Sequence, residues 1–220
     1  RLPPALATLR VAGRGTTPAR RGGPCAASAG LGRAGFMGRG PLMRSVPVWD
    51  APVRLLHWGM VTAVAMAWWS RSDTGPLHER VGYAIIALLA ARLAWGFCGS
   101  HYARFAQFVR APRATLAYAR AALAGRAPRY IGHNPLGGWM VLALLANLSL
   151  LGFTGWLQTT DMFWGYAWLA YLHKYLGWAL LALVALHVGG MLWTSWAHRE
   201  NLARAMVTGG KAPPGPHDVA

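Results

Sequence analysis

Acidic residues are scarce in this sequence, which has 6 Asp and Glu against 22 Lys and Arg. Charged residues of either sign make up only 13% of its 220 positions, while hydrophobic residues make up 55%. A soluble domain normally carries about 25% charged residues. The shortage of charge therefore excludes an ordinary soluble domain and indicates a membrane protein.

Cysteine is also nearly absent. Cys25 and Cys98 are the two in the chain, and they lie far apart in different surroundings. Such a pair indicates neither a disulfide framework nor a cysteine metal site. The sequence contains no Cys-x-x-Cys-His motif, so covalent attachment of haem is excluded as well.

The basic residues are concentrated in three segments. Nine Lys and Arg lie before Leu55, six lie between residues 99 and 134, and three follow Ala197. Arg71 is the one basic residue in the two remaining polar loops of the chain. This asymmetry is the positive-inside pattern, which predicts that both termini and the long middle loop are cytoplasmic. Because the charge is not spread over one globular face, we expect no nucleic-acid partner.

The chain changes character at residue 46. Residues 1–45 are rich in Gly, Pro, Ala and Arg without apolar periodicity, and predict a disordered extension, or sequence upstream of a true start at Met43 or Met37. Residues 46–211 predict one all-α membrane domain, an integral four-helix bundle, followed by a disordered tail at 212–220. The expected membrane spans are residues 51–70, 77–98, 135–157 and 172–197.

Local signals mark the ends of several helices. Asp50 and Asn134 each precede a proline at the start of an apolar run, which is typical of a capped helix start. Between the second and third spans, Pro112 and Gly125 delimit a short basic helix with apolar residues. We expect it to lie on the cytoplasmic membrane surface, with a solvated basic loop as the alternative.

Four histidines fall in the apolar segments. His173 and His187 are fourteen residues apart, which is about 21 Å of helix and nearly four turns, so they share one face at two membrane depths. The topology places His78 at the outer level with His173, and His57 at the inner level with His187. An intramembrane imidazole needs a partner. Two imidazoles from different helices at each level are what bis-histidine ligation of a haem inside a four-helix bundle requires.

A repeated pattern accompanies the two outer histidines. The chain reads LHERVGY from Leu77 and LHKYLGW from Leu172, so that a glycine, Gly82 or Gly177, follows each histidine by four residues. A glycine one turn along the same face leaves room for a flat macrocycle against the backbone. The alternative is that these glycines are ordinary small residues at helix crossings.

Arg92 is the other intramembrane site candidate. It lies fourteen residues after His78, near the inner level, where its guanidinium could pair with a haem propionate. Snorkelling to the headgroups explains it equally well. The remaining histidines lie outside the apolar spans and are interpreted as surface or interfacial residues; these are His101, His133, His198 and His217.

Other uses of the four intramembrane histidines fit less well. A tetrahedral zinc site needs its ligands within about 2 Å of one ion, which His173 and His187 cannot meet on one straight helix. A proton relay usually employs Asp and Glu, and Glu79 is the one acidic residue that approaches a membrane end.

Longer stretches of the sequence resemble the bacterial cytochrome b561 and nickel-hydrogenase cytochrome b family. They are VWDAPVRLLHW, LHERVGYAIIALLAARLAWGF, GHNPLGGWMVL, LHKYLGW, ALHVGG and HRENLARAMVTGGK, and the resemblance covers roughly residues 46–211. It implies a bacterial inner-membrane protein with four or five helices and two b haems, one bound by His57 and His187 and the other by His78 and His173. The depth argument gives the same pairs. Four predicted spans, where the hydrogenase-associated subgroup has five, weaken the expectation of a hydrogenase partner.

We therefore predict a di-haem b-type cytochrome that carries electrons between the quinone pool and a redox partner in a respiratory chain. The expected cofactors are two haem b groups, the expected substrate is a quinone or quinol, and the expected partners are lipid and a c-type cytochrome or dehydrogenase subunit. Two axial imidazoles leave iron no open position, which favours an electron-transfer subunit over a stand-alone oxidoreductase.

Two alternatives remain open. One is a self-contained quinone-linked oxidoreductase of the superoxide oxidase type, which basic residues near the outer haem would favour; Arg71, Arg80 and Lys174 are such residues. The other is a haem-free membrane anchor whose histidines merely pack. The sequence leaves the direction of electron flow, the quinone type and homo-oligomer formation open.

Overall fold

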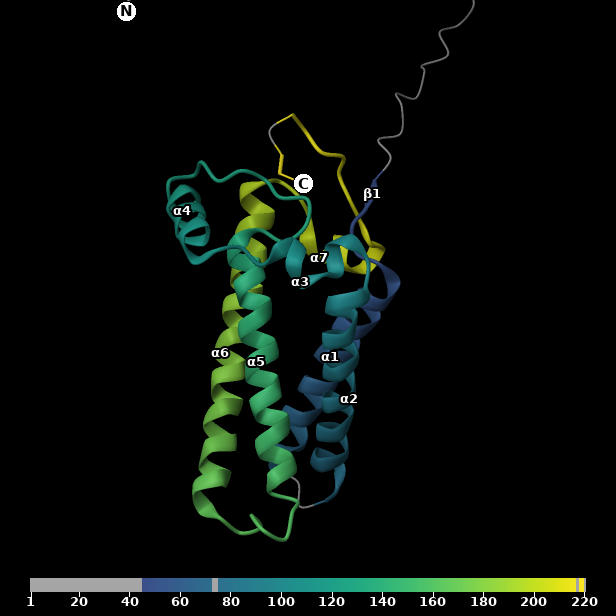
Figure 1. Ribbon diagram of the computed structural model, residues 1–220, viewed down its shortest axis with the longest axis vertical. Coiled ribbons are helices and arrows are strands. Elements are labelled where there is room, and N and C mark those ends of the chain that lie inside the picture. Colours follow the sequence, from purple (N-terminus) through teal and green to yellow (C-terminus); the bar gives the residue numbers. More distant parts are fainter. Residues whose placement is uncertain (1–44, 73–74, 217, 220) are drawn as a thin grey trace, which may run out of the picture. The chain divides into compact units, whose positions relative to one another are not determined.

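The computed structural model describes residues 45–72, 75–216 and 218–219. The predicted N-terminal extension lies outside the described residues, apart from its last residue. Four long helices dominate the described part (Figure 1). They are α1 (Ala51–Trp69), α2 (Leu77–Cys98), α5 (Pro135–Leu157) and α6 (Ala167–Ala197). The shorter elements are β1 (Val46–Pro47), η1 (Ser70–Ser72), η2 (His101–Ala103), α3 (Phe105–Phe108), α4 (Pro112–Leu123), α7 (Leu202–Thr208) and β2 (Gly210–Lys211).

The long helices begin where local chemistry favours a start. The Asp50 carboxylate accepts a hydrogen bond of 2.7 Å from the backbone N–H of Val53, and Asn134 Oδ1 accepts one of 2.7 Å from that of Gly137. Each satisfies a backbone donor that the first helical turn leaves unpaired, and proline in that turn costs no hydrogen bond. α6 begins at Ala167, five residues before the start of the membrane span predicted at 172–197.

Three of the described helices are long and apolar enough to cross a membrane, namely α2, α5 and α6. α1 spans 19 residues and carries Arg54 in its second turn. Large apolar side chains on the long helices stay exposed, among them Phe153, Trp178 and Leu186. Exposed apolar surface of this extent marks a lipid or partner interface.

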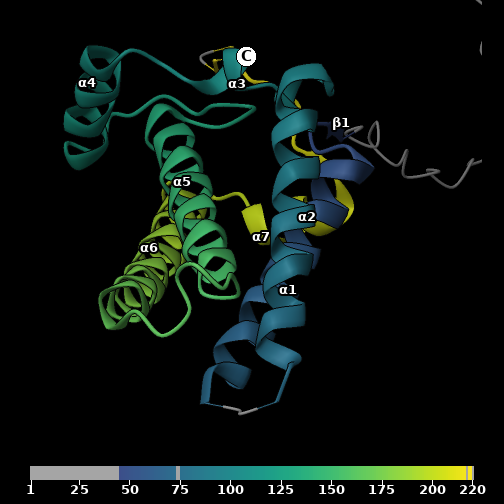
Figure 2. The same ribbon diagram turned by 60° about the horizontal axis from the view of Figure 1, so that its bottom comes forward.

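The long helices pack in two pairs, α1 with α2 and α5 with α6, and α2 also contacts α5 (Figures 1 and 2). Between them lies one apolar core, formed by Ala63, Val81, Ile85, Leu89, Leu148 and Leu180. We call the end that holds the starts of α1 and α5 the inner end, and the opposite end the outer end.

At the inner end, the C-terminal segment returns to the start of α1. β1 and β2 pair antiparallel, and Arg54 and Trp58 of α1 donate hydrogen bonds of 2.6 and 3.3 Å to the carbonyl oxygens of Val207 and Met206. A second apolar core underlies these contacts, formed by Val48, Trp49, Val53, Ala103, Ile131 and Ala205. The segment after α6 is therefore anchored to the first helix of the chain.

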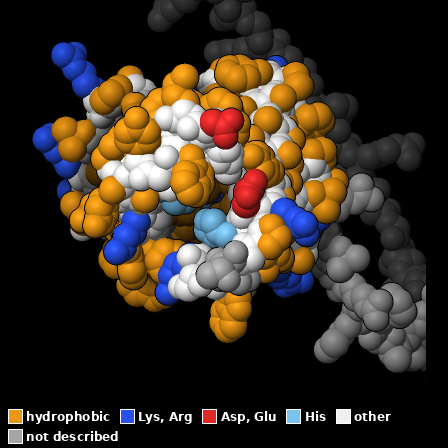
Figure 3. Space-filling view, turned by 90° about the horizontal axis from the view of Figure 1, so that it is seen from below, with side chains coloured by type: hydrophobic (Ala, Val, Ile, Leu, Met, Phe, Trp, Pro, Cys, Tyr) orange, Lys and Arg blue, Asp and Glu red, His pale blue; other side chains and the backbone are white. Residues whose placement is uncertain are grey.

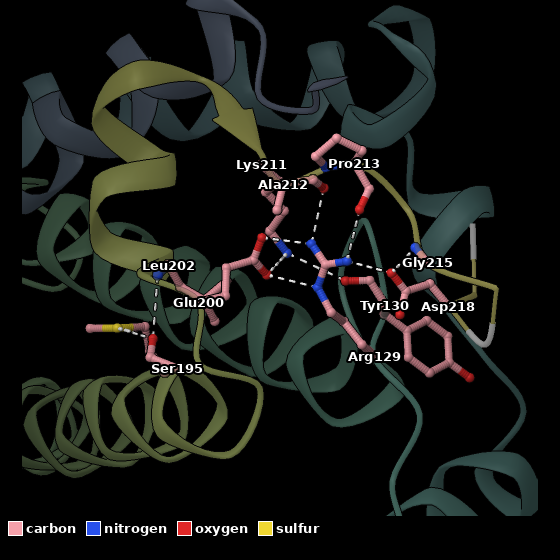
Figure 4. A network of polar contacts seen from close by, with 11 residues as sticks. Arg129, Tyr130, Ser195, Glu200, Leu202, Lys211, Ala212, Pro213, Gly215 and Asp218 are labelled. Carbon is pink, nitrogen blue, oxygen red and sulfur yellow. Dashed lines mark hydrogen bonds and ion pairs between the residues drawn. The ribbon is translucent and has the colours of Figure 1, made fainter. Parts of the chain in front are cut away.

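Arg129 holds the same segment to the loop before α5 (Figure 4). Its guanidinium bonds Glu200 at 2.8 Å, pairs with Asp218, and donates to the carbonyl oxygens of Ala212 and Pro213 at 3.0 and 3.4 Å. Lys211 lies 3.6 Å from Glu200. We call Arg129, Glu200, Lys211 and Asp218 the Arg129 cluster. Residues 212–216 and 218–219, for which the sequence predicts a disordered tail, contribute to these contacts.

Candidate functional site

The outer end contains a pair of facing histidines. His78 of α2 and His173 of α6 have ring centres 6.1 Å apart and ring planes at 83°. His78 Nδ1 lies 2.9 Å from the carbonyl oxygen of Ala67, and His173 Nδ1 lies 3.0 Å from the Thr154 hydroxyl oxygen. The Thr154 hydroxyl can donate to the Leu150 carbonyl at 2.8 Å and so accept from His173. Each ring can thus donate through Nδ1 and keep Nε2 as its basic nitrogen.

The inner end contains the second pair. His57 of α1 and His187 of α6 have ring centres 6.4 Å apart and ring planes at 55°. Across the part of the chain that the structure describes, neither ring has a hydrogen-bond partner, and His57 also packs edge-on against Trp58 at 5.3 Å. The pairing expected from membrane depth is therefore the pairing that the fold brings together.

Both separations suit a metal ion held between two rings. Two imidazoles that bind one ion from opposite sides, each through a nitrogen about 2 Å away, have ring centres roughly 6 Å apart. The two rings of each pair come from different helices. The described residues contain no group of three or more His, Cys, Asp and Glu that could hold a metal ion. The geometry therefore favours two bis-imidazole sites over a tetrahedral zinc site.

The glycines beside the outer pair leave space. A Cβ built on Gly82 would meet no atom within 4 Å, and one on Gly177 would meet only Trp68, at 4.0 Å. Gly155 differs, because its added Cβ would lie 3.2 Å from the His173 ring. Space one turn along from each outer histidine is what a flat macrocycle needs, so the residues present fit a haem.

Arg92 lies in the inner half of α2 with part of its guanidinium unused. Its Nη2 donates a long hydrogen bond of 3.4 Å to the carbonyl oxygen of Ala103, and its side chain stands over the Phe105 ring at 5.3 Å. Its Nη1 is buried without a hydrogen-bond partner. A buried, unpaired donor is costly, so this nitrogen fits an acceptor such as a carboxylate.

His133 is a residue that the sequence analysis assigned to the surface. The structure places its ring between Trp49 and Phe108, each 4.7 Å away, with Nδ1 buried and unpartnered. Burial, followed by the positive charges of Arg92 and Lys211, lowers the pKa of His133 to about 3, so the ring is neutral at physiological pH. The one feature of the sequence that could have indicated this burial is that His133 precedes Asn134. The Asn134 cap fixes the loop in which His133 lies.

The outer end is hollowed. Figure 3, seen from that end, shows histidine at the bottom of a hollow, with Lys, Arg and acidic side chains around it. Arg71, Arg80 and Lys174 are all exposed. The outer end thus carries charges of both signs, with Glu79 and Asp161 exposed as well, among exposed apolar side chains such as Trp69 and Trp164.

An apolar helical bundle with paired imidazoles at two depths defines the class, a membrane b-type cytochrome. The model of the prokaryotic cytochrome b561 family matches residues 48–209, and the chain belongs to that family. No curated protein and no solved structure matches the chain. Membership implies haem b as cofactor and electron transfer in a bacterial membrane as the general activity.

Proposed function

We propose that this protein carries electrons through two haem b groups, one held by His78 and His173 and the other by His57 and His187. The observation that carries the proposal is the 6.1 and 6.4 Å separation of the two ring pairs. Haem held between two imidazoles would supply one-electron transfer at each site. His173 and His187, one ligand from each site, lie on α6 about 21 Å apart along the helix axis.

The surrounding residues have separate tasks. The Ala67 carbonyl and the Thr154 hydroxyl orient the outer rings through Nδ1. Hydrogen bonds of this kind fix the tautomer and raise the basicity of the ligating nitrogen. At the inner end, the unpaired Nη1 of Arg92 would hold a propionate in a charge-assisted hydrogen bond. The chain's own residues thus position both groups and keep them in an apolar bundle.

The wider role follows from this arrangement. All four long helices cross the bacterial inner membrane with both termini in the cytoplasm, which the distribution of basic residues supports. A quinone or quinol reacts at one membrane interface, and a c-type cytochrome or dehydrogenase subunit exchanges electrons at the other. The protein is an electron-transfer subunit of a respiratory chain.

The test is haem content and spectroscopy of the purified protein. Reduced-minus-oxidised spectra should show b-type bands and two haems per chain. His173→Ala should lose the outer haem and His187→Ala the inner one, leaving about one haem per chain in each case. His101→Ala, at an exposed histidine of the inner end, is the matched control and should keep both. Two haems per chain in both ligand variants would reject the assignment of the ligands. A wild-type protein without b-type bands would reject haem binding and favour the alternative of a haem-free membrane anchor.

A second candidate is a self-contained quinone-linked oxidoreductase of the superoxide oxidase type. Exposed Arg71, Arg80 and Lys174 at the end with the hollow would attract an anionic reactant, against the opposing charge of Glu79 and Asp161 at the same end (Figure 3). Superoxide consumption by the purified protein with added quinone, weakened by Arg80→Gln and by salt, would support it. Superoxide or quinone turnover that requires a partner protein would favour the electron-transfer subunit instead.

A further inference from the structure

Helix α4 lies outside the two helix pairs, beside α5 at the inner end (Figures 1 and 2). One side of it faces the protein, where Tyr118 is buried and packs edge-on against Tyr130 at 5.5 Å. Leu116 and Leu123 point elsewhere and remain 53% and 87% exposed. Leucines this exposed in an anchored helix call for an apolar environment that the chain does not itself provide.

The exposed leucines share their face with arginines. Arg113, Leu116, Arg120 and Leu123 follow one another at spacings of three, four and three residues, which places them in one stripe along a helix. Tyr118 projects from the opposite side, since it is two residues from Leu116 and from Arg120. All four stripe residues are exposed. We call them the α4 stripe.

The charge of this region is uncompensated. No Asp or Glu occurs between residues 80 and 160, and no ion pair involves Arg113 or Arg120 among the residues that the structure describes. Arg110 and Arg126, on either side of the helix, are exposed as well. The stripe is thus a cationic and apolar surface that complements an anionic, amphipathic partner.

The depth of α4 fits a membrane surface. The indole N–H of Trp139, in the first turns of α5, donates a hydrogen bond of 3.1 Å to the carbonyl oxygen of Arg110, just before α4. Trp139 is itself exposed, and tryptophans at the ends of membrane helices lie at the headgroup level. α4 is therefore tied to the chain at the height where phosphate groups are found.

We propose that the α4 stripe binds acidic phospholipids of the leaflet at the inner end. Leu116 and Leu123 enter the boundary between headgroups and acyl chains, and the guanidinium groups of Arg113 and Arg120 bind lipid phosphates, which a planar fork of donors suits well. This surface does not depend on haem ligation. It depends only on the protein lying in a membrane.

The first experiment measures lipid selectivity. Purified holoprotein is exchanged into micelles with equal phosphatidylglycerol and phosphatidylethanolamine, and the retained lipid is quantified by mass spectrometry. The wild type should enrich phosphatidylglycerol, and the double variant Arg113→Gln with Arg120→Gln should bind it about 30-fold more weakly. The control removes two exposed charges elsewhere at the inner end, Arg104→Gln with Arg204→Gln, and should keep the enrichment.

An equal loss of phosphatidylglycerol enrichment in the control variant would overturn the proposal, because the total charge of the protein, and not the α4 stripe, would then determine lipid selectivity. Unchanged enrichment in the stripe variant, or release of bound nucleic acid in place of lipid, would also overturn it. Haem spectra and circular dichroism of each variant report whether the fold is intact, independently of lipid binding.

A second experiment measures the depth of α4. A fluorophore is placed at the exposed Ala117→Cys in a background carrying Cys25→Ser and Cys98→Ser, and the protein is reconstituted into vesicles. Nitroxides attached to lipid headgroups should quench it strongly in vesicles with phosphatidylglycerol and several-fold less in neutral vesicles or with the stripe charges removed. Equal, weak quenching in all samples would show a solvated loop and refute lipid docking.

Discussion

The two histidine pairs differ in how their rings are held. At the outer end each ring has a hydrogen-bond partner at Nδ1, the Ala67 carbonyl or the Thr154 hydroxyl. At the inner end neither ring has one in the described part of the chain, and Arg92 and His133 carry buried, unpartnered nitrogens there instead. The outer pair is thus oriented by neutral hydrogen bonds, whereas the inner end holds buried nitrogens of Arg92 and His133 that have no partner in the described part of the chain.

Two pairs of histidine rings with similar separations thus have different surroundings. Hydrogen bonds at the second nitrogen act on the ligand itself, through its orientation and basicity. A nearby cation acts through space, on the charge of whatever is bound. Variants at the outer end should therefore change how tightly the site holds its group, whereas variants at the inner end should change its potential.

The largest effect is expected from filling the space beside the outer pair. Gly177→Leu introduces a side chain where the protein leaves room, so a haem against that backbone would be expelled and haem content should fall from two to about one. Ala179→Leu places the same leucine side chain at an exposed position of the same helix and should leave both haems bound. Full haem content in Gly177→Leu would mean that the glycine is an ordinary helix-crossing residue.

A smaller effect is expected from removing the hydroxyl that holds His173. Thr154→Val keeps the shape of the side chain but leaves His173 Nδ1 without its partner, and should weaken retention of the outer haem by about 10- to 100-fold. Haem transfer to an apo-protein acceptor measures this. Ser149→Ala on the same helix is the matched control, because among the described residues the Ser149 hydroxyl donates to the Leu145 carbonyl and to no histidine. Equal loss in both variants would remove the distinction between the two ends.

Acid should loosen the inner end before the outer one. Burial raises the pKa of Glu200, but the hydrogen bond from Arg129 and the charges of Lys211 and Arg129 outweigh it and keep that pKa below its ordinary 4.5. A lowered carboxyl pKa gives stability that is complete above 4.5 and is lost as pH falls further. The cost is about 1.5 kcal/mol, as for a hydrogen bond to a charged group, or about a tenfold loss of hydrogen-exchange protection in residues 200–211, measured against the intrinsic exchange rate at each pH. Glu200→Gln should reduce this pH dependence and leave the part due to Asp218, whose pKa the Gly215 N–H and Arg129 also lower; a wild-type profile that stays flat below pH 4.5 would contradict the prediction.

Much of this arrangement could be predicted because it depends on helical periodicity. The spacing of His173 and His187 fixes a common face whatever surrounds it, and the structure brings each beside the expected partner. The Asp50 and Asn134 caps are equally local. Ligation by these residues and the count of two haems stay predictions.

The parts that could not be predicted depend on contacts between distant segments. The position of His133 between Trp49 and Phe108 requires three separate segments, one of them helix α3, to meet, and no periodicity in the sequence predicts such a contact. The Arg129 cluster likewise joins residues 129, 200, 211 and 218, whose charges look solvated in the sequence. The start of α6 at Ala167 lies among aromatic residues that do not distinguish a loop from a helix at a membrane interface.

The smallest effect is expected from Arg92, and it tests the inner half of the comparison directly. A positive charge near a haem favours the reduced form, so Arg92→Gln should lower the inner midpoint potential, on the order of 50 mV for a partly screened charge about 10 Å away. The outer haem serves as an internal control, and its midpoint potential should not change. Arg92→Lys keeps the charge and should restore most of the potential while losing the planar fork that suits a propionate. An unchanged midpoint potential of the inner haem in Arg92→Gln would mean that the guanidinium reaches the lipid headgroups and does not act on the haem. Some other group at the inner end would then have the role that the hydrogen bonds to Nδ1 have at the outer pair.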